Sequence, residues 1–128
     1  MDTIADMLNR IKNAQKVGHA GLDLPFSKIN FEIAKILAQE GFLSSAVKKG
    51  AKAKERLELV LKYEMGVPAI QDLKRVSKLG QRCFIKADKI KVTKQSRKLT
   101  IISTSRGLMT GGEARKKKLG GEVICEIW

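Results

Sequence analysis

Residues 99–113 read LTIISTSRGLMTGGE, and this stretch decides how the C-terminal half of the chain is built. Its first part is an apolar run with β-branched residues, which predicts a strand over 99–103. A hydroxyl-rich turn follows, and Thr110 opens a capping box that predicts a short helix over 113–118. A last apolar strand is predicted over 122–128. The C-terminal half is therefore expected to be mostly β, with one short helix.

Further elements are predicted in both halves. The N-terminal half carries two amphipathic helices, with Thr3 and Ser27 as their expected caps, and strands with alternating apolar residues. These elements are predicted at 2–17, 22–26, 27–40, 42–47 and 56–63. In the C-terminal half, additional short strands are predicted at 70–77, 82–86 and 89–94.

One segment, Met65-Gly66-Val67-Pro68, breaks regular structure and is the only internal boundary that the sequence offers. We therefore predict an α+β protein of two small packed domains. The N-terminal domain, with the order α-β-α-β-β, is expected to span 1–64. The C-terminal domain, mostly β with one short helix, is expected to span 68–128.

Charge is the strongest compositional signal. The 128 residues include 26 Lys and Arg against 13 Asp and Glu, a net charge of +13. The excess is spread along the chain, so folded surface must carry it, and a polyanion is the expected partner because neutralised phosphates release counterions. Only 5% of residues are aromatic, and most of these lie within apolar patterns. Contacts through phosphates, 2′-hydroxyls and helix shape, typical of folded RNA, are therefore favoured over stacking on single strands.

Other partners remain as alternatives. A general architectural DNA-binding protein would use the same charge, but the hydroxyl-rich turn would then have no special role. A merely solvated basic surface is a second alternative. An anionic membrane surface is disfavoured, because no basic amphipathic helix carries bulky aromatics on its opposite face.

The residues that leave the first strand of the opening stretch are the main candidates for contacting RNA. Ser103, Thr104 and Ser105 supply hydroxyls that donate and accept hydrogen bonds, which suits base edges and 2′-hydroxyls. Arg106 can hold a phosphate, and Gly107 lets the backbone turn closely. An ordinary Ser- and Thr-rich turn is the alternative interpretation.

Four later residues add charge or shape. Thr110 caps the short helix, whose free N–H groups can receive a phosphate, although a plain capped helix explains the motif as well. Arg115 and Lys116 begin a basic run that faces solvent or phosphate. Glu122 could accept a hydrogen bond from the hydroxyls of the turn or from a base amine.

No residue set points to catalysis or to a cofactor. Cys83 and Cys125 lie far apart in strand-like runs without a neighbouring His, so we expect two buried, reduced thiols and no metal site. His19 is the only His, and no catalytic set can be assembled around it. We expect no enzyme activity, no small-molecule substrate, no signal peptide and no membrane span, and hence a soluble, reducing compartment.

Several separate motifs match one family, in order, along nearly the whole chain. The C-terminal motifs are STSRGLMT at 103–110, EAR at 113–115 and GGEVIC at 120–125. The others are IADMLNRIKNA at 4–14, PFSK at 25–28, EGF at 40–42, LKY at 61–63 and KRVSK at 74–78. Together these motifs resemble the bacterial-type family of the eighth small-subunit ribosomal protein.

The resemblance implies a protein that binds the central domain of small-subunit ribosomal RNA directly and supports subunit assembly beside neighbouring small-subunit ribosomal proteins. It also implies binding to a mimic of that site in the protein's own messenger RNA, which represses translation of the operon. The implied location is the cytoplasmic ribosome, with an organellar ribosome left open. Phe84 stands where the family often has a Tyr, which keeps a stacking ring and removes a hydroxyl. The resemblance implies RNA contacts by Ser103, Thr104, Ser105, Arg106, Gly107, Arg10, Lys12, Asn13, Ser27 and Lys28. The predicted RNA-binding residues further include Phe84, Thr110, Glu122, Arg75, Arg115 and Lys116.

Overall fold

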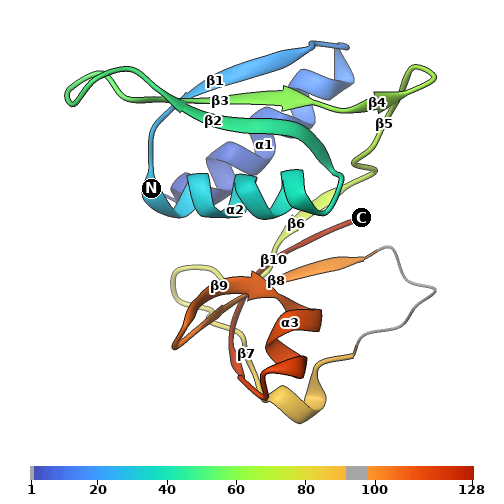
Figure 1. The fold of residues 1–128 in the computed structure, drawn as a ribbon. Helices are drawn as coiled ribbons and strands as arrows, with labels where there is room; N and C mark the ends of the chain where they lie inside the picture. The colour runs from blue at the N-terminus through green and yellow to red at the C-terminus, as the bar shows by residue number, and fades with distance from the viewer. Residues whose placement is uncertain (1, 92–97) are drawn as a thin grey trace. The chain divides into compact units, whose positions relative to one another are not determined.

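The computed structural model describes residues 2–91 and 98–128. The chain divides into two compact units, Met1–Gln71 and Asp72–Trp128, which are coloured from blue to green and from yellow to red in Figure 1. Each unit combines helical segments with an antiparallel sheet, so the predicted α+β class is confirmed. The divide follows Gln71 because Met65 and Gly66, within the expected boundary segment, form the turn of a hairpin instead.

The N-terminal unit has the predicted α-β-α-β-β order, followed by that small hairpin. Its elements are α1 (Thr3–Lys16), β1 (Gly21–Pro25), α2 (Lys28–Gln39), β2 (Leu43–Lys49), β3 (Arg56–Leu61), β4 (Tyr63–Glu64) and β5 (Val67–Pro68). β3 lies between β1 and β2 and pairs antiparallel with both. Its alternating Leu57, Leu59 and Leu61 are buried, and both helices cover the same side of the sheet (Figure 1). The core of this unit thus lies between one apolar face of the sheet and the two helices that cover it.

The helix starts differ in part from the prediction. Asp2 rather than Thr3 occupies the N-cap of α1, and its carboxylate accepts from the N–H groups of Ile4 and Ala5 at 3.1 and 3.2 Å. A charged carboxylate at the cap also interacts favourably with the helix dipole, which gives Asp2 the advantage. Ser27 does lie at the N-cap of α2, but its side chain makes no capping hydrogen bond.

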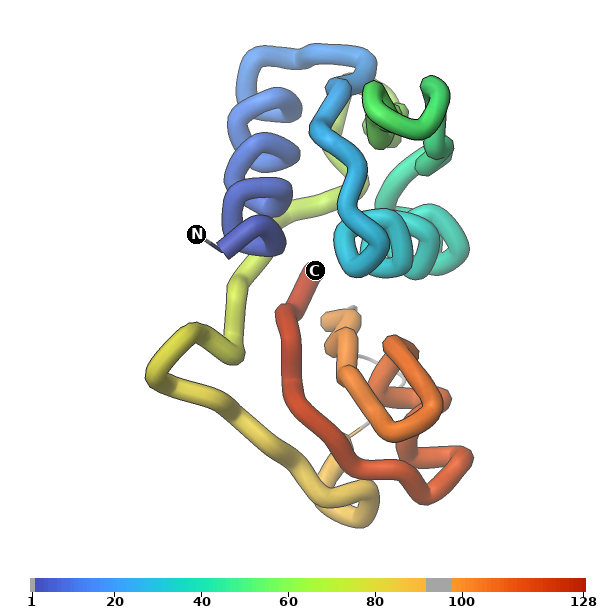
Figure 2. Tube along the Cα trace, turned by 90° about the vertical axis from the view of Figure 1, so that its left-hand side faces the viewer, coloured from blue at the N-terminus to red at the C-terminus, as the bar shows by residue number. Residues whose placement is uncertain are grey.

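The C-terminal unit is built around its last strand. Its elements are β6 (Leu73–Arg75), β7 (Phe84–Ile85), the 3-10 turn η1 (Ala87–Lys89), β8 (Leu99–Thr104), β9 (Gly107–Thr110), α3 (Gly111–Lys116) and β10 (Gly121–Ile127). β10 pairs with β8 along one edge and with both β6 and β7 along the other. Figure 2 traces β10, in red, to the C-terminus. Among the described strands, β9 pairs with β8 alone and is the outer strand of the sheet on that side.

Several predictions for this unit need correction. The expected strands at 70–77 and 82–86 shrink to the short β6 and β7, and Lys89, expected to begin a strand, ends η1 instead. Residues 92–94 of that expected strand lie outside the described residues. β9 is not predicted from the sequence, because four residues give too short an alternating pattern. α3 begins at Gly111 rather than at residue 113, since its cap, Thr110, directly precedes it.

A small core holds the C-terminal unit together. Its buried members come from both strands of the β8–β9 hairpin, from α3 and from the segment after η1, and they are Ile102, Met109, Ala114 and Ile90. Cys125 is buried as expected, but Cys83 is only partly buried. Phe84 lies in an apolar run, but 74% of its surface is exposed, which is compatible with the stacking ring that the resemblance implies.

Candidate nucleic-acid interface

The hairpin between β8 and β9 presents the predicted turn in a fixed shape. Thr104 pairs with Gly107, so Ser105 and Arg106 form a two-residue turn and both are exposed. The Thr104 hydroxyl donates to the Gly107 carbonyl at 2.9 Å and accepts from the Arg106 N–H at 3.1 Å. Gly107 has a φ of +104°, a backbone conformation that favours glycine. The side chains of Ser105 and Arg106 therefore project from a turn braced by Thr104.

A row of four side chains runs across the sheet beside this turn. Phe84 pairs with Glu122, Glu122 with Ser103, and Ser103 with Leu108. Directly paired residues point to the same face of a sheet, and Ile102, the neighbour of Ser103, points to the opposite face and into the core. The row thus places an exposed ring, a carboxylate and a hydroxyl on the face away from the core.

Two glycines allow this row to form. A Cβ on Gly120 would lie 2.6 Å from the Ile85 carbonyl oxygen, and a Cβ on Gly121 would collide with the Ser103 carbonyl. Only glycine lets β10 approach β7 and β8 this closely. The two consecutive glycines, Gly120 and Gly121, therefore allow the three strands that carry Phe84, Glu122 and Ser103 to lie close together.

Glu122 has a partner that sequence reasoning did not identify. An Arg82 guanidinium nitrogen lies 3.1 Å from the Glu122 carboxylate, whose side chain is 20% exposed. Ser77, also not identified, is fully buried, and its hydroxyl accepts from the Cys83 N–H at 2.8 Å. The Arg82 ion pair and the bond from the Val123 N–H to the Cys83 carbonyl, at 2.8 Å, hold the segment before Phe84 against β10. The ion pair also partly neutralises the Glu122 carboxylate.

Two predicted site residues make contacts within the unit: Thr110 is buried and Arg75 is half-buried. Thr110 is 7% exposed, and its hydroxyl accepts from the Glu113 N–H at 3.1 Å as the cap of α3. Arg75 donates to the Ile124 carbonyl at 2.6 Å and so joins β6 to β10. Both residues support the sheet that carries the row.

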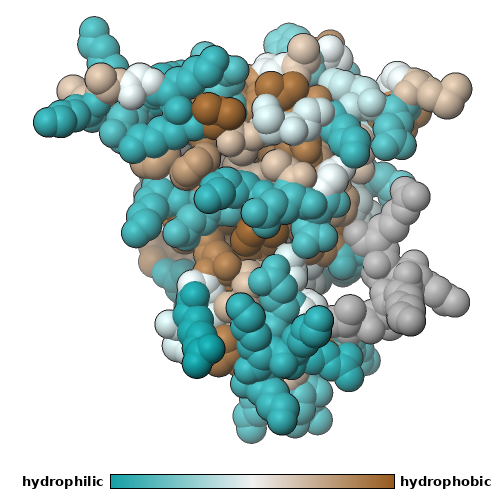
Figure 3. Space-filling view, viewed as in Figure 1, coloured by the Kyte–Doolittle hydropathy of each residue, from teal (hydrophilic) through white to brown (hydrophobic). Residues whose placement is uncertain are grey.

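Arg115 and Lys116 are exposed on α3, and hydrophilic side chains cover this part of the surface (Figure 3). α3 ends at Lys116, and the chain turns away at Lys118, which has a φ of +58°, while the Leu119 N–H bonds the Ala114 carbonyl at 2.8 Å. The basic run from Arg115 to Lys118 therefore lies on the last turn of α3 and on the turn that follows it.

The remaining predicted residues belong to the N-terminal unit. Arg10, Lys12 and Asn13 are exposed on α1, and Arg10 pairs with Asp6 at 3.1 Å. Ser27 is half-buried and Lys28 exposed at the start of α2. These side chains are thus presented by two helices that cover one face of the N-terminal sheet.

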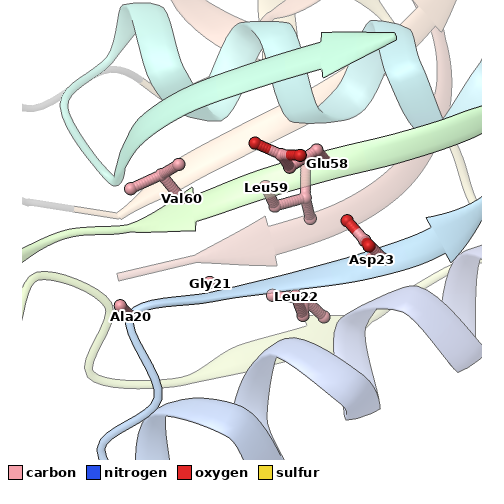
Figure 4. A pocket seen from close by; sticks show the side chains of 7 residues that line it. All are labelled: Ala20, Gly21, Leu22, Asp23, Glu58, Leu59 and Val60. Carbon is pink, nitrogen blue, oxygen red and sulfur yellow. The ribbon is translucent and has the colours of Figure 1, made fainter. Parts of the chain in front are cut away.

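The N-terminal sheet also carries a hollow whose chemistry does not suit RNA. Asp23 and Glu58 pair across β1 and β3, and both carboxylates project on the same side (Figure 4). The hollow around them is lined by Ala20, Gly21, Leu22, Asp23, Glu58, Leu59 and Val60. Lys49 pairs with Glu58 at 2.8 Å, but the Asp23 carboxylate beside it repels phosphate, so we exclude the hollow from the interface.

The described residues contain no group of three His, Cys, Asp or Glu side chains placed to hold a metal ion. Among those same residues, no helix is long and apolar enough to cross a membrane. Burial raises the pKa of the Cys125 thiol to about 12, so this thiol is neutral in the folded protein.

Comparison with known proteins agrees with the motifs. The family model described as Ribosomal protein S8 matches residues 2–128. The chain is 44% identical to the small ribosomal subunit protein uS8 of Thiobacillus denitrificans, over 98% of this chain and 96% of the relative. It is 43% identical to the uS8 protein of Syntrophus aciditrophicus, over 99% of this chain and 97% of the relative. This membership confirms a structural ribosomal role rather than an enzymatic one. The chain belongs to the ribosomal protein S8 family of the small ribosomal subunit.

Proposed function

We propose that this protein binds small-subunit ribosomal RNA directly, through the β8–β9 turn and the row beside it. The observation that supports this most is the exposed Ser105-Arg106 turn, which the Thr104 hydroxyl braces from both sides. Hydroxyls carried on a braced backbone can bond base edges and 2′-hydroxyls with little reorganisation of the turn, which favours recognition of one RNA shape over others.

Each residue of the proposed interface has a distinct role. Ser103 and Ser105 contact bases or 2′-hydroxyls, and Arg106 holds a phosphate. Phe84 offers its exposed ring for stacking on an unpaired base. Thr104, Gly107, Thr110, Glu122 and Arg75 are positioning residues, since their contacts within the unit shape the turn and the row.

The basic side chains supply affinity rather than sequence preference. Arg115 and Lys116 contact phosphates from α3, and Arg10, Lys12, Asn13, Ser27 and Lys28 support the RNA from the N-terminal unit. The net charge of the C-terminal unit fits this role, because residues 72–128 hold fifteen Lys and Arg against five Asp and Glu.

The proposed RNA contact has consequences for the ribosome. Binding to the central domain of the RNA supports assembly of the small subunit of the cytoplasmic ribosome, beside neighbouring ribosomal proteins. A messenger RNA segment that copies the shape of the ribosomal site would be bound by the same turn and row. The protein would then repress translation of its own operon when ribosomal RNA is scarce.

Competition between two nucleic acids tests the proposal. A central-domain ribosomal RNA fragment and a DNA duplex of equal length compete for the protein at moderate salt. We expect the RNA to win by well over about ten-fold, because the DNA offers phosphates but no 2′-hydroxyls. Equal affinities would overturn the proposal and favour a general DNA-binding role.

Two substitutions separate the proposed roles. Ser105→Ala should weaken RNA binding about ten-fold and leave the salt dependence unchanged, because it removes a hydrogen bond and no charge. Lys116→Ala should lower the slope of log K against log salt by about 0.7 to 0.9, one phosphate contact. If both variants gave the same profile, the assignment of Ser105 to base or ribose contacts would be wrong.

A further inference from the structure

The net charge of the N-terminal unit is concentrated in one loop. Residues 48–56, which connect and flank β2 and β3, contain five Lys and Arg residues and one acid, Glu55. The rest of Met1–Gln71 contains six Lys and Arg against seven Asp and Glu. Without this loop the unit would have a net charge of −1, so the loop supplies the whole positive excess of the unit.

The loop has a defined shape. The Lys54 N–H bonds the Ala51 carbonyl at 2.8 Å, and Lys49 pairs with Arg56 across the strands at its base. Gly50 has a φ of +91° and lies so close to the Lys54 carbonyl that a side chain would collide with it. The loop projects beyond the sheet (Figure 1), and hydrophilic side chains cover its end (Figure 3, upper left).

Two of the lysines are fixed at the base of the loop. Lys48 lies 4.7 Å from the centre of the Phe26 ring and 3.2 Å from the Glu55 carboxylate. The hydrogen bond from Lys49 to Glu58, at 2.8 Å, raises the pKa of Lys49. These contacts brace the base, as does the bond from the Phe26 N–H to the Glu55 carbonyl at 3.2 Å.

The lysines at the end of the loop are placed differently. Lys52 and Lys54 are exposed, and in the described part of the chain no ion pair holds either of them. Their neighbours are the small residues Ala51 and Ala53, whose side chains are too short to shield the two ammonium groups from a binding partner. Protein interfaces are depleted in Lys and enriched in aromatic residues, whereas phosphate backbones are bound by such point charges.

We propose that the loop between β2 and β3 is a phosphate-binding finger, in which Lys52 and Lys54 contact the backbone of the bound RNA. The finger adds a contact from the N-terminal unit to the contacts assigned above, and this inference rests on the proposed RNA-binding function. It carries no sequence preference, because it offers charges without groups that read base edges.

The test uses the full chain with small-subunit ribosomal RNA and the double variant Lys52→Gln/Lys54→Gln. We expect the slope of log K against log salt to fall by about 1 to 2, and affinity near 0.1 M salt to fall about ten-fold or more. The matched control, Lys16→Gln/Lys62→Gln, removes the same charge at the other end of the sheet, since Lys62 directly follows β3. The control should keep nearly the wild-type slope.

Two failures can be told apart. If the wild-type protein does not prefer RNA to duplex DNA, the proposed function falls, and the finger falls with it. If the wild type prefers RNA and Ser105→Ala weakens binding, but the double variant keeps the wild-type or control slope, only the finger is wrong. An acidic protein partner for the loop would give this second result. All four residues of the two double variants have side chains at the surface, so circular dichroism should show equal folding.

Discussion

Replacing Gly121 by alanine tests whether the close approach of β10 to β8 holds the proposed interface together. A Cβ at this position collides with the Ser103 carbonyl oxygen, and it lies 2.8 Å from the carbonyl carbon and 3.1 Å from the Ile102 side chain. The carbonyl belongs to a paired backbone and cannot swing aside as a flexible side chain could. The two strands must therefore separate at the pair formed by Glu122 and Ser103.

The cost follows from this geometry. Overpacking at a closely packed position costs about 1 to 3 kcal/mol. Each backbone hydrogen bond between the strands that is lost costs about 0.5 to 1.5 kcal/mol more. We expect Gly121→Ala to lower the free energy of unfolding of the C-terminal unit by about 2 to 3 kcal/mol, about 30- to 150-fold in the equilibrium constant. With a slope of about 1 kcal/mol per molar, the urea midpoint falls by about 2 to 3 M.

A tryptophan at the end of β10 provides the assay. Trp128 is the only tryptophan, and its backbone N–H and carbonyl both bond Asp72, so its fluorescence follows unfolding of the C-terminal unit. Gly112→Ala is the matched control, because a Cβ there meets only the Thr110 hydroxyl, at 3.8 Å. Alanine in this exposed helical turn should stabilise by up to about 1 kcal/mol. Equal midpoints for Gly121→Ala and the wild type, or equal losses in both variants, would refute the reasoning.

Other predictions concern stability and thiol chemistry. Met65 has a φ of +52° beside Gly66 at +79°, so Met65→Asn should raise the thermal midpoint by a few degrees in calorimetry, because Asn tolerates this conformation; a lower midpoint would contradict the turn assignment. Thr110→Ala should cost about 1 kcal/mol in a urea titration, since α3 loses its cap. A thiol reagent should modify partly buried Cys83 before Cys125 in the folded protein. Because burial raises the pKa of Cys125 from 9.0 to about 12, stability should fall as pH rises through this window, and Cys125→Ala should reduce that loss.

The main elements of the fold could be predicted because their signals are local. Helical periodicity placed α1 and α2, and strict alternation of Leu57, Leu59 and Leu61 placed β3 with its buried face. The capping box at Thr110 placed the short helix to within two residues. Each of these signals repeats over several residues or fixes one defined hydrogen bond, so tertiary contacts reinforce it rather than override it.

The missed elements are short and depend on partners. β4, β5 and β7 have two residues each, too few for any alternating pattern, and they exist because a neighbouring strand supplies their hydrogen bonds. The exposure of the Phe84 ring could not be predicted either, because β7 is too short to show an alternating pattern. Its neighbours Cys83 and Ile85 suggest a buried run, and only the pairing with Glu122 shows which way the ring points.

In the candidate site too, the part formed by consecutive residues could be predicted, and the part formed by strand pairing could not. The residues 103–107 are contiguous, so their grouping could be predicted, but the brace that Thr104 gives to the turn required the observed hydrogen bonds. The row from Phe84 to Leu108 joins four strands, and its members come together only through strand register. The ion pair between Arg82 and Glu122 spans 40 positions and has no local signal.

Net charge and the fixed geometry of the site are therefore expected to contribute differently to RNA binding. The C-terminal unit has fifteen basic against five acidic side chains, and such an excess attracts any polyanion, RNA and DNA alike. Discrimination must then come from groups whose positions are fixed before binding, because mobile groups would adapt to either partner. The interface proposed above has such groups in the braced turn and in the row that Gly120 and Gly121 bring together. Since the glycines and Thr104 carry no charge, their effect on the preference for RNA over DNA separates shape recognition from electrostatic attraction.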